Sequence, residues 1–274
     1  MSADGTRAGA EVTPAARPVA GIVARPLRDW AERDAAVRLY RAVFALPAED
    51  PAVSPRLLAG LQRNGGSAVG AFDADELVGF AYGFTGTDGT VTYHYSQAAV
   101  VAAGAQGRGV GRLLKYAQAD VARATGVRTM RWTYDPLLAR NAHFNLDVLG
   151  AEGRWFTRDF FDVGALSDAE PAGDRVTVTW PLDAGPPAGP VGAPALPAGI
   201  APPRWGEVRP DGDDLLLGIP ADWASAMARD AEAARRVRGS VAEALADALA
   251  GDRRLVSCRR VDADLAVYRL RRLR

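Results

Sequence analysis

The chain has 274 residues, 48% of them hydrophobic, with 33 basic and 33 acidic side chains and a formal net charge of zero. This composition is ordinary for a globular protein and excludes wholesale disorder. The balanced charge argues against a nucleic-acid partner, and no apolar run approaches the roughly 18 residues of a membrane-spanning helix, so no membrane partner is expected.

The first 20 residues lack the continuous apolar segment of a secretory signal, and we expect them to be a disordered leader. The sequence therefore predicts a cytoplasmic protein. The only cysteine, Cys258, excludes an internal disulfide, and its strand-like surroundings favour a buried thiol over a catalytic one. No set of metal ligands stands out, so no metal site is expected.

Two helix starts follow a first predicted strand at residues 21–27. Asp29 with Glu32 three residues later has the spacing of a capping box, which predicts a helix whose apolar stripe ends near residue 47. Ser54 followed by Pro55 predicts the N-cap and first turn of a second, short helix.

Three strand-like runs come next, at residues 67–73, 77–85 and 90–102. Only short turns separate them, so consecutive strands must be antiparallel, since a parallel neighbour requires a crossover of about a dozen residues or more. A glycine-rich loop then leads into a predicted helix from Val110 to Gly126, and residues 127–134 form the next predicted strand.

The rest of the chain predicts a closing part and a smaller extension. Asn141 is the expected cap of a short helix, and residues 154–163 and 175–180 are strand-like. The extension should hold helices at 220–228 and 231–250 and a hairpin of residues 254–261 and 265–270. A segment rich in Pro, Gly and Ala precedes it. The expected organisation is a leader (1–20), a main domain (21–165), a connecting strand and linker (166–203) and an α+β extension (204–274).

The loop Gln106-Gly-Arg-Gly-Val-Gly111 between strand and helix suits a phosphate, because successive backbone amides and the helix N-terminus point at one place. A P-loop would need Lys and Ser or Thr where Val110 and Gly111 stand. A dinucleotide fingerprint would need glycine or alanine at Arg112 and a parallel crossover before the loop. Both patterns fit poorly, although Asp135 lies near the acidic position of the second.

The pattern Gln-x-x-Gly-x-Gly after an apolar strand and before an amphipathic helix resembles the coenzyme A motif of the GNAT superfamily of acyl-CoA N-acyltransferases. The order of elements over residues 21–163 is similar too. The resemblance implies an α+β fold with a mixed, mostly antiparallel sheet flanked by helices, and acetyl-CoA or another acyl-CoA as cosubstrate. It implies pantetheine contacts from the backbone of Val100 and Val101, and a diphosphate site made by Gln106, Gly107, Arg108, Gly109, Val110, Gly111 and Arg112.

Two later positions bear on the same resemblance. Asn141 matches an Asn that contacts pantetheine in many members, whereas the Tyr that protonates the departing thiolate is replaced here by Leu146. This departure puts the usual general acid in doubt. A thiol pKa of about 8.5 still makes the thiolate a tolerable leaving group without assistance.

An amine attacks a thioester only when it is unprotonated, so the site needs a base, a water chain or burial that lowers the amine pKa. His94, on the strand before the loop, is the candidate base. Tyr134 and Asp135 are candidates to orient the amine or relay its proton. The alternatives are a packed strand histidine, a core tyrosine and a turn-forming aspartate.

The sequence thus predicts direct transfer of an acetyl or other short acyl group to a small-molecule amine such as an amino acid. Residues 135–146 and 174–180 are similar to a GNAT branch with a C-terminal extension, and some related proteins are associated with N-succinylation, so the acyl group could be succinyl. The alternative is a non-catalytic acyl-CoA sensor or interaction module. A homodimer is one candidate for the oligomeric state.

Overall fold

The computed structural model describes residues 21–47, 49–50, 53–162, 173–184, 196, 199 and 201–273. The expected leader and much of the expected linker lie outside the described residues. The chain forms two compact units, residues 1–130 and 131–274. The expected domain boundaries at 165 and 203 stay a prediction.

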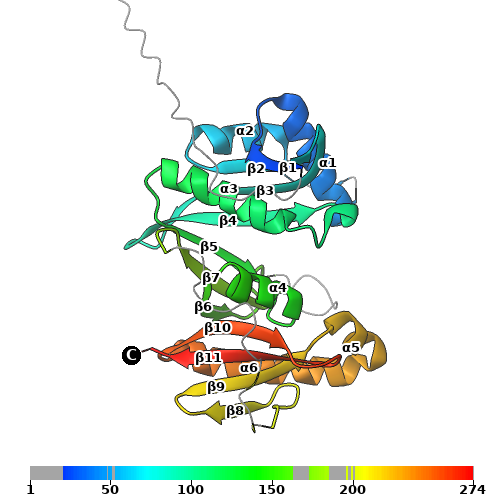
Figure 1. The fold of residues 1–274 in the computed structure, drawn as a ribbon, viewed down its shortest axis with the longest axis vertical. Helices are drawn as coiled ribbons and strands as arrows, with labels where there is room; N and C mark the ends of the chain where they lie inside the picture. Colours follow the sequence, from blue (N-terminus) through cyan, green and yellow to red (C-terminus); the bar gives the residue numbers. More distant parts are fainter. Residues whose placement is uncertain are drawn as a thin grey trace, which may run out of the picture. The chain divides into compact units, whose positions relative to one another are not determined.

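The first unit is a four-stranded sheet with helices on both faces (Figure 1). Its strands follow chain order and every neighbouring pair is antiparallel: β1 (Ile22–Pro26), β2 (Ser67–Asp73), β3 (Glu76–Thr87) and β4 (Thr92–Val101). Helices α1 (Trp30–Val43) and α2 (Pro55–Arg63) cover one face, and α3 (Val110–Ala124) covers the other. The predicted antiparallel meander is confirmed.

Both predicted helix caps of the first unit are confirmed. The carboxylate of Asp29 accepts from the Glu32 amide at 2.9 Å, and the Ser54 hydroxyl accepts from the Leu57 amide at 3.2 Å, with Pro55 in the first turn. Each side-chain oxygen satisfies an amide that has no carbonyl partner inside its helix. These local bonds fix where α1 and α2 begin.

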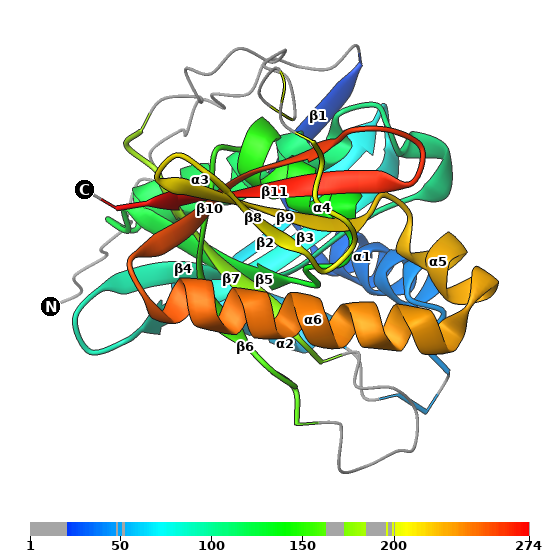
Figure 2. The same cartoon turned by 90° about the horizontal axis from the view of Figure 1, so that it is seen from below.

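The second unit holds the order β5-β7-β6-β10-β11-β9-β8. Its strands are β5 (Thr129–Tyr134, which begins in the first unit), β6 (Glu152–Thr157), β7 (Arg175–Pro181), β8 (Val208–Asp211), β9 (Asp214–Pro220), β10 (Arg253–Arg260) and β11 (Leu265–Arg272). The helices are α4 (Ala139–His143), the π-helical turn η2 (Phe144–Val148), α5 (Trp223–Arg229) and α6 (Ala231–Ala250). Figure 2 shows α6 along its full length after the short α5.

Three sequence predictions for this unit are wrong. The strand expected at residues 154–163 ends at Thr157, and residues 158–161 form a turn. Pro220 ends β9 rather than starting a helix, and α5 begins only at Trp223, capped by Asp222. Asn141 lies inside α4, whose N-cap is Leu138, so it does not cap that helix. In contrast, α6 spans the predicted residues, and β10 and β11 form the predicted antiparallel hairpin.

Asp147 joins η2 to β10. Its carboxylate accepts from the Ser257 hydroxyl at 2.7 Å, the Cys258 amide at 2.8 Å and the Arg259 guanidinium at 2.8 Å. His143 Nδ1 lies 3.2 Å from the same carboxylate, and only 6% of the Asp147 side chain is exposed. Burial alone would raise the Asp147 pKa, but these hydrogen bonds outweigh it and hold the pKa below its ordinary value. The buried carboxylate is therefore charged, and both of its oxygens accept hydrogen bonds.

Candidate functional site

The glycine loop connects β4 to α3 through a short 3₁₀ turn, η1 (Ala103–Ala105). Gly107 and Gly109 both have φ of 77°, a left-handed conformation that L side chains rarely adopt. An added Cβ at Gly107 would meet no atom within 4 Å, so its glycine is required by conformation and not by crowding. Gly109 is the N-cap of α3. The two left-handed residues turn the chain from strand into helix.

Five successive backbone amides, those of residues 107–111, donate no hydrogen bond of good geometry within the described residues, although residues 106–109 form a turn. The first helical bonds at this end come from Arg112 and Leu113, both to the Gly109 carbonyl. Unpaired amides at a helix start attract anions, because the helix dipole adds positive potential there. The loop therefore fits the diphosphate of coenzyme A.

The polar side chains of the loop differ in whether they already have a partner within the protein. Arg108 pairs with Asp73 at the end of β2, with 2.9 Å between guanidinium and carboxylate, a contact that sequence reasoning missed. Both side chains are exposed enough that the pair contributes little to stability. Arg112 is exposed and available to an anion. The Gln106 side chain donates weakly to the Val101 carbonyl, at 3.4 Å, and so turns back toward β4.

The strand before the loop carries an irregularity near its middle. Ala98 pairs with Tyr82 and Ser96 with Gly83, so Gln97 is an extra residue without a partner on β3. Such a bulge bends a strand and locally disturbs its ladder. Val100 and Val101, the proposed pantetheine contacts, lie beyond the bulge and pair with Phe80 and Gly79. Val100 is buried and Val101 is half-buried.

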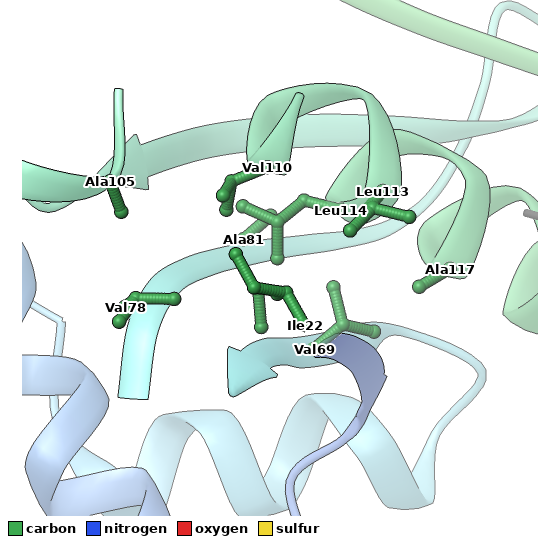
Figure 3. Close-up of a cluster of buried hydrophobic side chains, with 10 residues drawn as sticks. Ile22, Val69, Val78, Ala81, Ala105, Val110, Leu113, Leu114 and Ala117 are labelled. Atoms are coloured by element: carbon green, nitrogen blue, oxygen red, sulfur yellow. The ribbon is translucent and has the colours of Figure 1, made fainter. Parts of the chain in front are cut away.

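A hydrophobic cluster holds α3 on the sheet behind the loop (Figure 3). Its side chains from α3 point to those of β1, β2 and β3; the labelled members are Ile22, Val69, Val78, Ala81, Ala105, Val110, Leu113, Leu114 and Ala117. Val110, the first residue of α3, is buried in this cluster. Apolar packing thus fixes the helix end that presents the free amides.

The family model described as "Acetyltransferase (GNAT) family" matches residues 26–144 of the chain. These residues are a GNAT acetyltransferase domain. The predicted resemblance and the α+β fold are confirmed, and acetyl-CoA, the acyl donor of GNAT acetyltransferases, is the expected cosubstrate. The match includes the whole glycine loop and ends at Phe144, so the last strands and α6 lie beyond it.

Three solved structures of acetyltransferases, the first of them from the GNAT family, are similar to part of the chain. One from Desulfovibrio desulfuricans is 18% identical, with TM-score 0.48, and covers 59% of this chain and 99% of its own. A Salmonella typhimurium structure with acetyl-CoA as its cofactor is 22% identical, with TM-score 0.48 and coverages of 61% and 99%. The Escherichia coli ribosomal-protein-S18-alanine N-acetyltransferase is 17% identical, with TM-score 0.46 and coverages of 60% and 96%. No curated protein matches the chain significantly.

A buried chain of polar side chains lies beneath the GNAT domain's α3. Lys115 donates to the Ser96 hydroxyl at 2.8 Å, Ser96 donates to the Gln118 oxygen at 2.8 Å, and the Gln118 amide donates to Ser67 at 3.1 Å. The Ser67 hydroxyl then faces His94 Nε2 at 2.8 Å. The Ser67 hydroxyl either donates to this ring nitrogen or accepts from it, according to the tautomer of His94. Sequence reasoning missed this network, which links β2, β4 and α3.

His94 is fully buried at the end of this network. Burial, together with the charge of Lys115, lowers its pKa to about 4. Its Nδ1 is buried and has no hydrogen-bond partner among the described residues. This environment does not favour His94 as a base that meets an amine directly.

Lys115, the only lysine of the chain, is 4% exposed, and burial lowers its pKa to about 7. The folded pKa is below that of an unfolded lysine, so above pH 7 the unfolded state binds more protons and stability rises with pH. Relative to Lys115→Met, we expect the wild-type free energy of unfolding to rise by about 1 to 2 kcal/mol between pH 7 and 8.5. Urea unfolding of both proteins at several pH values measures this difference. Arg112→Met on the same helix is the control, and parallel pH curves for wild type and Lys115→Met would contradict the expectation.

The residues predicted to contact the acyl acceptor, the amine, belong to the second unit. Tyr134, the last residue of β5, is buried, and burial raises its pKa well above the ordinary value, although a hydrogen bond with Tyr268 opposes this. Asp135 follows it, and its Oδ1 accepts from the Leu137 amide at 2.9 Å. Asn141 is exposed on α4, and Leu146 is buried in η2. The position of the usual family tyrosine is thus part of the core.

No helix among the described residues is both long and apolar enough to span a membrane.

Proposed function

We propose that the chain is an N-acyltransferase that moves an acetyl or other short acyl group, with succinyl as a candidate, from acyl-CoA to the amine of a small molecule such as an amino acid. The observation that carries the proposal is the row of five amides without a well-formed hydrogen bond at the start of α3, inside the part of the chain that matches the GNAT family. The amine attacks the thioester carbonyl directly, the carbon–sulfur bond breaks, and the coenzyme A thiolate takes up the proton that the amine loses. The protein is proposed to act in the cytoplasm.

The residues take the following roles in this proposal. The amides of 107–111 hold the diphosphate, Arg112 adds a charge-assisted contact, and the backbone of Val100 and Val101 pairs with pantetheine. Asn141 contacts the pantetheine from the later helix. Tyr134 and Asp135 orient the amine. His94 does not contact the amine in this proposal. Together with Ser67 it belongs to the buried network that holds β4 against α3.

A second candidate function is a non-catalytic acyl-CoA sensor, and the buried Leu146 in place of the family's tyrosine favours it. A sensor binds acyl-CoA through the same loop but releases no thiol. Both functions therefore predict acyl-CoA binding, and only the enzyme predicts turnover.

Native mass spectrometry followed by a donor and acceptor screen separates them. We expect the purified protein to carry coenzyme A or an acyl-CoA, and we expect thiol release with at least one amine at a rate at least tenfold above the rate without acceptor. Gly109→Glu, purified in parallel, controls for contaminating activity. Binding without turnover across a broad panel of amines and acyl-CoAs would support the sensor, and absence of both would refute both functions.

A further inference from the structure

Arg238 of α6 reaches the residue that follows β5. Its Nη2 lies 3.3 Å from Asp135 Oδ2, and the two side chains are only 12% and 13% exposed. The ring of Trp223 lies under the guanidinium, with 4.8 Å between Cζ and the ring centroid. A residue beyond the family match is thus placed against a candidate acceptor-side residue.

The contacts of Arg238 are incomplete. Its Nε and Nη1 are buried, and neither donates to an acceptor within the described residues. Asp135 gives Arg238 a single long bond and uses its other oxygen for the Leu137 amide. A buried guanidinium that leaves most of its five N–H groups unpaired is costly, and such a group in a native protein calls for a missing acceptor. A carboxylate matches the planar fork of donors.

The extension also holds the turn in which Asp135 lies. The Tyr268 hydroxyl, on β11, donates to the Pro136 carbonyl at 2.8 Å and lies 3.3 Å from the Tyr134 hydroxyl. Both tyrosines are buried. Side chains from α6 and β11 therefore fix the backbone and the carboxylate directly after β5, and this fixed position suits a group that must orient a substrate.

We propose that Arg238 binds a substrate carboxylate while Asp135 orients the amine, so that the C-terminal extension selects the substrate. The adjacent positive and negative side chains complement the two ends of an α-amino acid. The carboxylate could equally belong to a dicarboxylic acyl group, and the experiment separates these sources. This inference rests on the proposed function.

The test compares wild type with Arg238→Gln on two pairs of substrates. One arm uses acetyl-CoA with α-amino acids and with their α-amides; the other uses succinyl-CoA and acetyl-CoA with one amine. We expect Arg238→Gln to lower kcat/KM at least 30-fold for the carboxylate-bearing member of one pair and less than threefold for its neutral partner. The affected pair identifies the source of the carboxylate. The Kd for coenzyme A should not change.

Arg236→Gln is the matched control, because Arg236 lies on the same helix and pairs with the exposed Glu232 one turn away. Equal losses for charged and neutral substrates, or a wild type that does not discriminate between them, would overturn the proposal. If no amine is turned over, the proposed function fails, and calorimetric titration with succinate and with succinamide tests Arg238 alone. We then expect wild type to bind succinate at least tenfold more tightly than succinamide, and Arg238→Gln to lose that preference. An equal affinity of wild type for both would refute the carboxylate site.

Discussion

Gly109→Glu is expected to weaken coenzyme A binding by at least a hundredfold. Gly109 has φ of 77° at the start of α3, and a side chain there costs about 1 to 2 kcal/mol in the left-handed conformation. The new carboxylate would also stand beside the amides proposed to hold a diphosphate, and like charges at that place repel. Calorimetric titration with coenzyme A measures the loss, and far-UV circular dichroism checks that the fold is kept.

The loop offers two informative companions to this variant. Gly107→Ala adds only the left-handed strain, because the added Cβ meets open space, and we expect about a tenfold loss. Gly104→Ala is the neutral control, since Gly104 is not left-handed and its added Cβ also meets nothing within 4 Å. If Gly109→Glu bound coenzyme A within threefold of wild type, the loop would not be the diphosphate site.

Asp147→Ala should lower the free energy of unfolding by about 3 to 5 kcal/mol, because it removes the buried acceptor of the half-buried Ser257 and Arg259 side chains and of the Cys258 amide. This loss is a large part of the stability of an ordinary domain. Urea unfolding at pH 7.5, followed by circular dichroism, measures it.

A surface carboxylate provides the comparison for Asp147. Asp34 pairs with Arg38 one turn away on α1, and both side chains are well exposed. Asp34→Ala is expected to change stability by less than about 0.5 kcal/mol. A similar, small change for Asp147→Ala would mean that the joint between η2 and β10 does not stabilise the second unit.

Local signals in the sequence were sufficient for much of the GNAT domain. The caps at Asp29 and Ser54 depend on bonds to amides three residues away, so the pattern alone identifies them. The antiparallel meander follows from turns too short for a crossover. The loop is recognisable for the same reason, since its glycines and the helix that follows are contiguous in the chain.

The parts that were missed depend on distant residues or on strands with weak patterns. Strand β8 spans only four residues and contains Pro210, so neither its length nor its alternation marks it. Lys115 and Gln118 lie on one face of α3 by their spacing, but nothing local indicates that Ser67 and Ser96 meet them. Arg238 is 103 residues from Asp135. The polar partners of a site come from the tertiary fold, which periodicity does not describe.

Because its single lysine is buried, the folded protein should react very little with amine-reactive reagents. Apart from the chain's own N-terminal amine, no primary amine is exposed, so acetyl-CoA meets no competing surface lysine and self-acetylation should contribute little background to a thiol-release assay. The same property makes Lys115 a reporter. A mass tag on this buried residue requires α3 to open away from the sheet, so its rate of labelling would measure how often α3 opens.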